Sequence, residues 1–341
     1  MNRVLLFVNP VFEQRLSQRN ALSRIASLLR TEGCQVEMEE SLSAQSAGEQ
    51  AREAVAEGFD AILVCGGDGT LFRVLQGVAG SEMPVGILPF GTGNVLVQNL
   101  RLPRNPLEAA RILLRSRPRA IPVGSMTCHR QGHLAPSSYF FTIAAGVGLH
   151  AALMQVSESG SKRRGGRAAY YMGGARLLLR HPVEPFDVEI TEIDGKVTRM
   201  WASELIAVRV GALNRWRPAG NLEEPVLRLA VVPPTSRLGL AHASFHALAG
   251  EPAPPLGEAA EKRDIQDSVV VPLACADGNV RRHKRKLPNA TYYDAVRVAC
   301  RAISNYPYRA KMLAEADGEV LGDSSAVISM AEEKVNLLWP G

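Results

Sequence analysis

The amino-acid sequence predicts two domains, an α/β domain with a parallel sheet followed by an antiparallel β-sandwich or barrel-like domain. Three observations support this fold class. The chain has 341 residues, which is more than a single domain usually contains. Up to about residue 125, short apolar runs alternate with stretches of helical periodicity. Beyond that residue, most runs are typical of strands and are separated by turn residues.

Apolar and amphipathic segments alternate through the first part of the chain. Apolar or β-branched runs predict strands at residues 4–8, 34–39, 61–65 and 84–90. Apolar residues at helical spacing predict helices at residues 16–29, 47–57, 70–78 and 106–116, the last with Pro106 at its first position. Since apolar strands alternate with amphipathic helices, we expect a parallel sheet that is covered on both faces.

Strand-like runs dominate the second part of the chain. They lie at residues 137–148, 186–193, 199–210, 226–234, 267–276 and 293–303. A helical segment at 168–182 interrupts them, and 250–262 and 281–288 are predicted loops. The final stretch, 324–341, is apolar again, and we expect it to pack back onto one of the two domains.

Composition limits the classes of function. The hydrophobic content of 46% and the charged content of 21% are those of a globular protein, and no apolar run is long enough to span a membrane. The N-terminal apolar stretch is too short for a signal peptide, so we expect a cytoplasmic protein. The five cysteines are scattered along the chain, which argues against disulfides and against a zinc site.

Basic residues gather in three segments, 101–119, 161–167 and 281–286, although the net charge is only +5. Such segments suit phosphates on nucleotides, lipid head groups or nucleic acid, or they are solvated loops. A nucleic-acid-binding protein is the weakest of these interpretations, because aromatic residues do not interleave the basic ones and no nucleic-acid-binding module is recognisable.

A glycine-rich loop follows the apolar strand at 61–65 and precedes a helix. It consists of Gly66, Gly67, Asp68, Gly69 and Thr70. Open α/β sheets bind ligands at this edge, where glycines let backbone N–H groups approach a phosphate and the helix N-terminus favours an anion. A carboxylate beside an anion site needs a cation, so Asp68 suggests Mg²⁺ carried with a nucleotide.

A second glycine-rich loop has the same setting. It contains Gly91, Thr92, Gly93 and Asn94, after the strand at 84–90 and before a helix that starts near Val95. Two such loops at successive strand ends predict the opposed walls of one cleft. Neither loop has the pattern of a P-loop or of a Rossmann dinucleotide fingerprint.

Five motifs together carry a resemblance that covers essentially the whole chain. They are Asn9-Pro10, Gly66-Gly67-Asp68-Gly69-Thr70, Pro89-x-Gly91-Thr92-x-Asn94, Gly146-x-Gly148 and Asp317-Gly318-Glu319. In this order and spacing they resemble the diacylglycerol kinase catalytic-domain family. That family includes bacterial soluble lipid kinases and sphingosine kinases and is distantly related to NAD kinases.

The resemblance implies a Rossmann-like nucleotide-binding domain at 1–125, joined by the returning segment 322–341, and a β-sandwich domain for the lipid at 126–321. ATP would lie between them with Mg²⁺, and its γ-phosphate would pass to the hydroxyl of a lipid such as diacylglycerol. The implied nucleotide contacts are Asn9, Ser41, Gly66, Gly67, Asp68, Gly69, Thr70, Gly91, Thr92 and Asn94. The implied catalytic residues are Asp68, Asp317 and Glu319, with Glu319 as general base. Asp68 is also the implied metal ligand, mainly through the nucleotide phosphates.

Several positions depart from the family pattern. Val95 and His150 stand where many relatives have aspartates, and Asn9-Pro10 is followed by Val-Phe-Glu-Gln rather than Ser-Gly. Only Glu223 and Glu224 are available where many bacterial members carry aspartates for a structural Mg²⁺. Two readings therefore stay open, an active lipid kinase of a divergent subgroup and a weakened or inactive member that binds nucleotide or lipid as a regulatory protein.

The segment 161–181 joins a basic loop to an apolar helix that bears aromatic residues. Such a segment suits the surface of an anionic membrane, with Lys162, Arg163 and Arg164 as the contacts, or it is a core helix with a solvated end. We therefore expect either a cytoplasmic protein or one that also binds peripherally to the inner membrane face. A homodimer is one oligomeric state open to the chain, and several classes of lipid alcohol stay open as the substrate.

Overall fold

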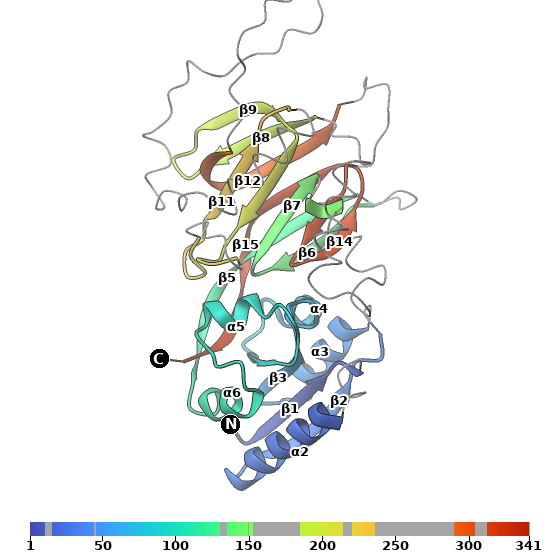
Figure 1. Cartoon of the computed structure of the whole chain (residues 1–341), viewed down its shortest axis with the longest axis vertical. Helices are drawn as coiled ribbons and strands as arrows, with labels where there is room; N and C mark the ends of the chain where they lie inside the picture. Colours follow the sequence, from blue (N-terminus) through green and yellow to red (C-terminus); the bar gives the residue numbers. More distant parts are fainter. Residues whose placement is uncertain are drawn as a thin grey trace, which may run out of the picture.

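The computed structural model describes residues 1–10, 16–43, 46–129, 135–148, 150–152, 185–213, 220–235, 290–303 and 312–340. Two parts lie one above the other along the longest axis (Figure 1). The lower part contains a parallel sheet with helices, and the upper part consists mainly of antiparallel strands. This arrangement confirms the predicted fold class, an α/β domain with a β-rich C-terminal domain.

The lower sheet is parallel, with the order β4-β3-β1-β2. Its strands are β1 (Arg3–Val8), β2 (Gln35–Glu40), β3 (Ala61–Gly66) and β4 (Pro84–Pro89). The helices are α2 (Leu16–Thr31), α3 (Ala47–Ala56), α4 (Asp68–Val78), α5 (Val95–Asn99) and α6 (Pro106–Leu113). All six residues of β3 are buried, as a strand in the middle of a covered sheet requires.

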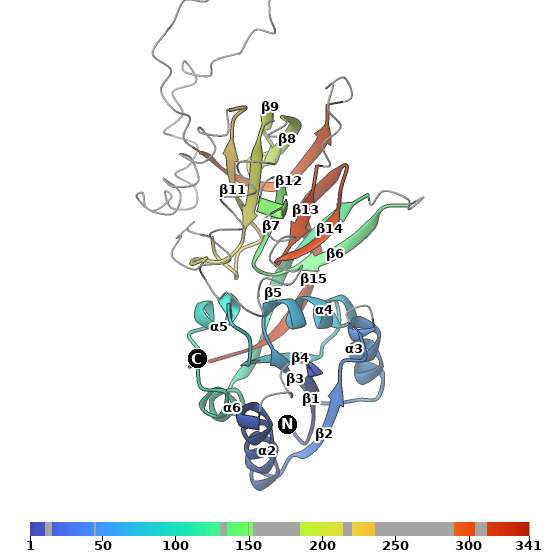
Figure 2. The ribbon, with the colours of Figure 1, turned by 45° about the vertical axis from the view of Figure 1, so that its right-hand side comes forward.

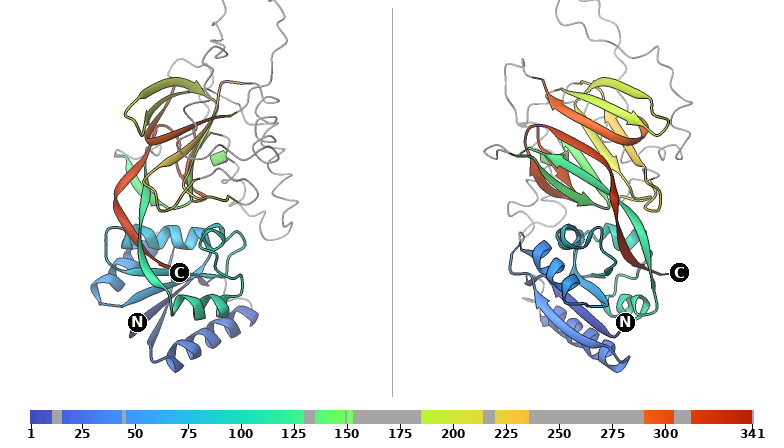
Figure 3. Two further views of the ribbon diagram at one scale, coloured as in Figure 1. Left: turned by 90° about the vertical axis from the view of Figure 1, so that its left-hand side faces the viewer. Right: turned by 180° about the vertical axis from the view of Figure 1, so that it is seen from behind.

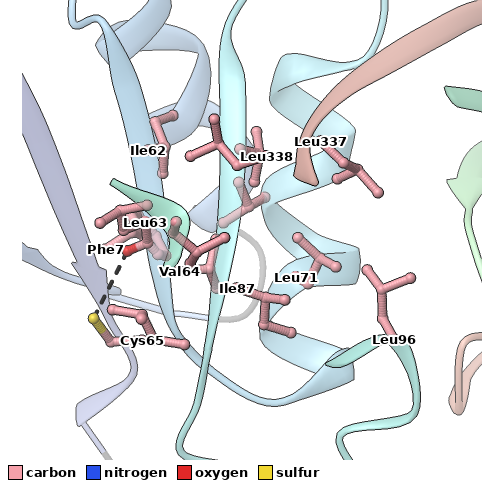
Figure 4. Packing of buried hydrophobic residues seen from close by; sticks show 14 of the residues in the cluster. Phe7, Ile62, Leu63, Val64, Cys65, Leu71, Ile87, Leu96, Leu337 and Leu338 are labelled. Atoms are coloured by element: carbon pink, nitrogen blue, oxygen red, sulfur yellow. Dashed lines mark hydrogen bonds between the residues drawn. The ribbon is translucent and has the colours of Figure 1, made fainter. Parts of the chain in front are cut away.

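Apolar side chains from the strands and helices form the core of the lower part. Figure 4 shows Ile62, Leu63 and Val64 of β3 packed among residues of neighbouring elements, including Leu71 of α4. Leu337 and Leu338, from the far end of the chain, belong to the same buried cluster. The core of this part therefore depends on residues separated by most of the sequence.

The upper part is built from antiparallel pairs in the order β14-β13-β7-β10-β11-β12-β15. Strands β5 and β6 extend it from β15, and β8 and β9 extend it from β12. The strands are β5 (Arg117–Cys128), β6 (Ser137–Phe141), β7 (Ala144–Gly148), β8 (Phe186–Glu192), β9 (Val197–Ala202), β10 (Glu204–Val208), β11 (Leu227–Val232), β12 (Thr291–Ala302), β13 (Ala314–Ala316), β14 (Glu319–Gly322) and β15 (Ala326–Trp339). A second buried cluster fills this part.

The last strand, β15, connects the two parts. It pairs antiparallel with β12 and β5 and then runs parallel to β4 through Asn336 and Leu337 (Figure 3). Strand β5 crosses the predicted boundary at residue 125. The division into 1–125 with 322–341 and 126–321 stays a prediction.

Several predicted segments fall outside the described residues. They are the helix at 168–182, the strand at 267–276, the loops at 250–262 and 281–288, and the basic residues Lys162, Arg163 and Arg164. Within the described ranges, no helix is long and apolar enough to cross a membrane. The four described cysteines, at positions 34, 65, 128 and 300, are buried.

Candidate active site

The first glycine-rich loop makes a tight turn from β3 into α4. Gly67 is the N-cap residue, and its carbonyl oxygen accepts hydrogen bonds from the backbone N–H groups of Thr70 (3.0 Å) and Leu71 (3.1 Å). A Cβ atom on Gly66 would lie 2.5 Å from Thr70 Oγ1, so no larger residue fits there without a shift. The turn directs the N-terminus of α4, with its partial positive charge, to the edge where β3 ends.

The two glycine-rich loops are in direct contact. A Cβ atom on Gly91 would lie 2.5 Å from the Cα atom of Gly67, and the Gly91 N–H donates to the Gly66 carbonyl at 3.1 Å. Asn94 adopts a left-handed backbone conformation (φ 48°, ψ 49°) and donates from Nδ2 to the Gly91 carbonyl at 2.7 Å. Thr92, between them, is exposed. The structure thus brings together the two loops that the sequence predicts to form one site.

Asp68 joins the two loops through its side chain. Its Oδ2 atom accepts a hydrogen bond from the Val95 N–H (2.9 Å), and Oδ1 accepts one from the Leu96 N–H (3.1 Å). The carboxylate of α4 therefore caps the start of α5. Burial raises the pKa of Asp68 above its ordinary value, although these backbone hydrogen bonds act in the opposite direction. Because Val95 contacts Asp68 through its backbone N–H, any residue except proline could make this hydrogen bond at position 95.

Asn9 and Ser41 lie at the ends of the neighbouring strands. Asn9 donates from Nδ2 to Thr70 Oγ1 at 3.0 Å, which connects the end of β1 to the first turn of α4. Ser41 follows β2, where its N–H donates to the Val8 carbonyl at 2.8 Å and its hydroxyl donates to the Ser43 carbonyl at 2.9 Å. Both predicted residues therefore lie at the same edge of the sheet as the glycine-rich loops.

Asp317 holds the tight turn between β13 and β14. Its Oδ2 atom accepts hydrogen bonds from the N–H (2.9 Å) and hydroxyl (3.1 Å) of Thr142. Its Oδ1 atom accepts from the N–H groups of Ile143 (2.8 Å) and Ala144 (3.0 Å). Burial raises the pKa of Asp317 to about 6, to which nearby Asp68 also contributes, against the lowering effect of the backbone donors.

The same turn is held from its other side by Glu315. Glu315 Oε2 accepts a hydrogen bond from the Gly318 N–H at 2.9 Å. Asp317 and Gly318 both have positive φ angles, 48° and 88°. With Asp317 and Glu315 both attached to the backbone around it, the turn presents Glu319 at a defined place.

Glu319 lies over the first turn of α4. A Cβ atom on Gly69 would be 2.7 Å from Glu319 Oε1. Arg73, one helical turn further along α4, donates from Nη2 to Oε1 (3.0 Å) and Oε2 (3.1 Å) of Glu319. Figure 2 shows β14 above α4. Folding therefore brings the late Asp-Gly-Glu motif to the first glycine-rich loop, from 250 positions away in the chain.

Arg73 belongs to none of the sequence motifs and was not predicted as a site residue. It lies four residues after Gly69 on a predicted helix, which places both on one face. That spacing is the only signal in the sequence, and it gains meaning only when Glu319 is known to lie on the same face.

The Gly146-x-Gly148 motif makes room for two buried carboxylates. A Cβ atom on Gly146 would lie 3.0 Å from Glu315 Oε1, and one on Gly148, where φ is 112°, would lie 2.8 Å from Glu204 Oε2. Glu204 Oε1 accepts a hydrogen bond from the His150 N–H at 3.0 Å, and His150 Nε2 lies 3.4 Å from Glu315 Oε1. Burial lowers the pKa of His150 to about 4, which favours the neutral imidazole.

The described residues contain no group of three or more His, Cys, Asp or Glu side chains placed to hold a metal ion. Glu223 instead pairs with Arg119 at 2.7 Å, and Glu224 Oε1 accepts from Asn221 Nδ2 at 2.9 Å. The donor set near the glycine-rich loops fits a cation that arrives with phosphate ligands better than a cation held by the protein alone.

The sequence of this chain is similar to those of known proteins. Residues 3–126 match the family model described as the diacylglycerol kinase catalytic domain. The chain is 27% identical to the diacylglycerol kinase of Bacillus subtilis (strain 168) over 257 residues, which are 74% of this chain and 80% of that protein. It is also 27% identical to the diacylglycerol kinase of Staphylococcus carnosus (strain TM300) over 262 residues, 73% of this chain and 78% of that one.

A solved structure shares the whole fold. The crystal structure of a diacylglycerol kinase from Bacillus anthracis superposes with a TM-score of 0.63 and covers 99% of this chain and 97% of its own. The sequence identity over this superposition is 19%, so the likeness concerns the fold.

Proposed function

We propose that this chain, which belongs through residues 3–126 to the diacylglycerol kinase catalytic-domain family as its motifs predict, is an ATP-dependent lipid kinase. The observation that carries the proposal is the position of Glu319 over the first turn of α4. A carboxylate is thereby placed beside a loop suited to phosphates. A phosphotransferase that acts on a hydroxyl needs these two groups side by side.

The nucleotide is proposed to bind where the two glycine-rich loops meet. Gly66, Gly67, Gly69 and Gly91 keep side chains away from the phosphates, and the N-termini of α4 and α5 offer partial positive charge. The polar contacts in this proposal are Asn9, Ser41, Thr70, Thr92 and Asn94. The hydrogen bond from Asn9 to Thr70 joins two of these residues, which supports a shared nucleotide-binding surface.

Glu319 is proposed to accept the proton of the lipid hydroxyl as that oxygen attacks the γ-phosphorus. Asp317 supports this role indirectly, because its four hydrogen bonds hold the turn that carries Glu319. Mg²⁺ bound to the phosphates would neutralise their charge. Asp68 is its proposed ligand in the chain, through the lone pairs that the Val95 and Leu96 N–H groups leave over.

The lipid is the second substrate of the proposal. Two curated relatives that align with most of this chain are named diacylglycerol kinases, which supports a glycerolipid alcohol as the acceptor. Peripheral membrane contact through Lys162, Arg163 and Arg164, a cytoplasmic location and a homodimeric state remain part of the proposal.

A weakened or inactive member that binds nucleotide or lipid is the second candidate. Two observations favour it: both Asp68 oxygens are engaged by α5, and His150 rather than a carboxylate lies beside Glu315. Under this reading the glycine-rich loops bind nucleotide, but no phosphate is transferred.

The test is transfer of labelled phosphate from ATP with Mg²⁺ to lipid alcohols in mixed micelles. The panel contains diacylglycerol, monoacylglycerol, a sphingoid base and a polyprenol. We expect one labelled lipid, and loss of label with Asp68→Ala and with Glu319→Gln. ATP binding without transfer to any lipid would instead support the second candidate.

A further inference from the structure

We propose that Arg73 is a positioning residue for Glu319, and that turnover, rather than nucleotide binding, depends on it. The inference rests on the proposed function, since it assigns Glu319 a part in phosphoryl transfer. It concerns a residue that none of the five sequence motifs contains.

Arg73 supplies both hydrogen bonds that the described residues give to the Glu319 carboxylate. Nη2 lies 3.0 Å from Oε1 and 3.1 Å from Oε2. The side chains are 29% and 23% exposed, so the pair is partly shielded from water. A glutamate side chain has three rotatable torsions, and an arginine on its carboxylate removes much of that freedom.

The helix that carries Arg73 is itself attached to the upper part of the molecule. Gln76 donates from Nε2 to the Phe140 carbonyl (2.9 Å) and accepts from the Phe140 N–H at Oε1 (2.9 Å). The Phe72 ring stacks on Tyr139 with centroids 6.3 Å apart. Arg73 therefore extends from a helix whose position relative to β6 is already set.

The two α4 residues next to the Glu319 carboxylate, Gly69 and Arg73, lie on one face of the helix. Gly69 and Arg73 are separated by four residues, hence by about one helical turn. Gly69 provides space for the carboxylate, and Arg73 holds it there. Without the guanidinium, the turn at Asp317 and Gly318 would still place the Glu319 backbone, but the carboxylate would sample other rotamers.

The experiment compares Arg73→Ala and Arg73→Lys with the wild-type chain. The matched control is Arg119→Ala, which removes an arginine from an exposed ion pair with Glu223. Arg119 lies opposite Leu337, which pairs with Val85 at the start of β4, whereas the second glycine-rich loop follows the end of that strand. We measure kcat and KM for the lipid that the micelle assay identifies, and the Kd for ATP by direct binding. A displacement of about 1 Å in a catalytic group can lower rates by about a hundredfold.

We expect Arg73→Ala to lower kcat by about 10- to 100-fold, while the Kd for ATP stays within about twofold of wild type. Lysine keeps the charge without the planar fork, so Arg73→Lys should recover part of the loss. Methylguanidinium should also restore part of the activity of Arg73→Ala. On a Glu319→Gln background, Arg73→Ala should have no further effect.

Two outcomes would overturn the proposal. One is an Arg73→Ala variant with wild-type kcat. The other is a variant with unchanged kcat and a tenfold weaker Kd for ATP, which would make Arg73 a nucleotide contact.

A second measurement separates this inference from the proposed function. If the wild-type chain phosphorylates no lipid, the proposed function fails. Urea unfolding of Arg73→Ala, Glu319→Gln and the double variant then tests whether Arg73 and Glu319 are in contact in solution. A non-additivity of at least about threefold in the unfolding equilibrium constant supports the contact in solution. Additive effects would overturn it.

Discussion

Glu319 Oε1 lies directly above Gly69, so close that a Cβ atom on Gly69 would be 2.7 Å from it. We predict that Gly69→Ala displaces the carboxylate and lowers turnover by about 10- to 100-fold. The fold should survive, because alanine in a helix is more favourable than glycine by up to about 1 kcal/mol. Steady-state kinetics beside urea unfolding measures both effects.

A double variant tests whether the loss of turnover in Gly69→Ala depends on Glu319. Combined with Glu319→Ala, which removes the obstructed carboxylate, Gly69→Ala should cause no further loss of turnover. Gly211→Ala is the matched glycine control, since its Cβ atom would meet only an ordinary contact at 3.4 Å. A further loss in the double variant would mean that Gly69 acts through the nucleotide alone.

Asp68 is predicted to stabilise the fold as well as to take part in binding. Asp68→Ala leaves the Val95 and Leu96 N–H groups without their acceptor, which should cost about 1–2 kcal/mol in the free energy of unfolding. Asp68→Asn keeps one acceptor and should cost less.

The matched control for Asp68 is Asn105→Ala. Asn105 is the N-cap residue of α6, and its Oδ1 atom accepts hydrogen bonds from the Leu107 and Glu108 N–H groups. This variant should lose about 1 kcal/mol but keep the Kd for ATP. If Asp68→Ala and Asn105→Ala bound ATP equally well, Asp68 would not be a nucleotide contact. If Asp68→Ala left the free energy of unfolding unchanged, Asp68 would not stabilise the start of α5.

Gln76 is predicted to hold the lower and upper parts together. Gln76→Ala deletes both hydrogen bonds to Phe140 and should lower the free energy of unfolding by about 2 kcal/mol. Amide hydrogen exchange provides a local measurement: the Phe140 N–H should exchange faster, while that of Phe7, in the core of the lower sheet, keeps its protection relative to global unfolding. Equal changes at both amides would indicate a general loss of stability instead.

Arg228 and Asp294 form a buried ion pair between directly opposed residues of β11 and β12, with Nη1 and Oδ1 3.1 Å apart. Burial lowers the pKa of Arg228, although Asp294 acts to raise it. We predict that Arg228→Met costs about 3–5 kcal/mol in the free energy of unfolding, because it removes the buried guanidinium that faces the Asp294 carboxylate. The double variant Arg228→Met with Asp294→Leu should regain most of that loss.

Arg199→Met is the control for this prediction. Arg199 pairs with Glu189 on the exposed face of the β8–β9 hairpin, and its side chain is 78% exposed. Its removal should leave the unfolding midpoint unchanged. A double variant at positions 228 and 294 that is no more stable than Arg228→Met would contradict the pairing argument.

Asp317 is predicted to make stability depend on pH. Its pKa is about 6 in the folded chain, against 3.8 as the ordinary value, so between these pH values the folded chain holds a proton that the unfolded chain has lost. Stability contributed by this group therefore falls as pH rises through the window. From pH 7 to pH 4 the wild type should gain about 2–3 kcal/mol relative to Asp317→Asn.

Urea unfolding of the wild type and Asp317→Asn at pH 4 and pH 7 measures this difference. Asp317→Asn also alters hydrogen bonds, which changes the free energy of unfolding by the same amount at both pH values. This change therefore cancels when the two pH values are compared. A gain for the wild type at higher pH would show instead that the hydrogen bonds from Thr142, Ile143 and Ala144 outweigh burial.

The alternation of elements and both glycine-rich loops could be predicted because each depends on local chemistry. Helix α4 begins at Asp68, two residues before its predicted start, and Gly67 is its N-cap residue. The partners of Asp68 were not predictable, because they are backbone N–H groups of another loop. The neighbours of Gly146 and Gly148 were missed for the same reason: Glu204 and Glu315 come from β10 and β13.

The order of the residues alone establishes the two kinds of sheet, the glycine-rich loops and the family resemblance, because periodicity and turn chemistry act over a few residues. The meeting of Glu319 with Gly69 and Arg73 depends on tertiary packing instead. So do the Asp68 cap on α5 and the pairing of β15 with β4. Contacts between residues far apart in the chain form only when the strands between them pair in register, and short-range patterns carry no record of that register.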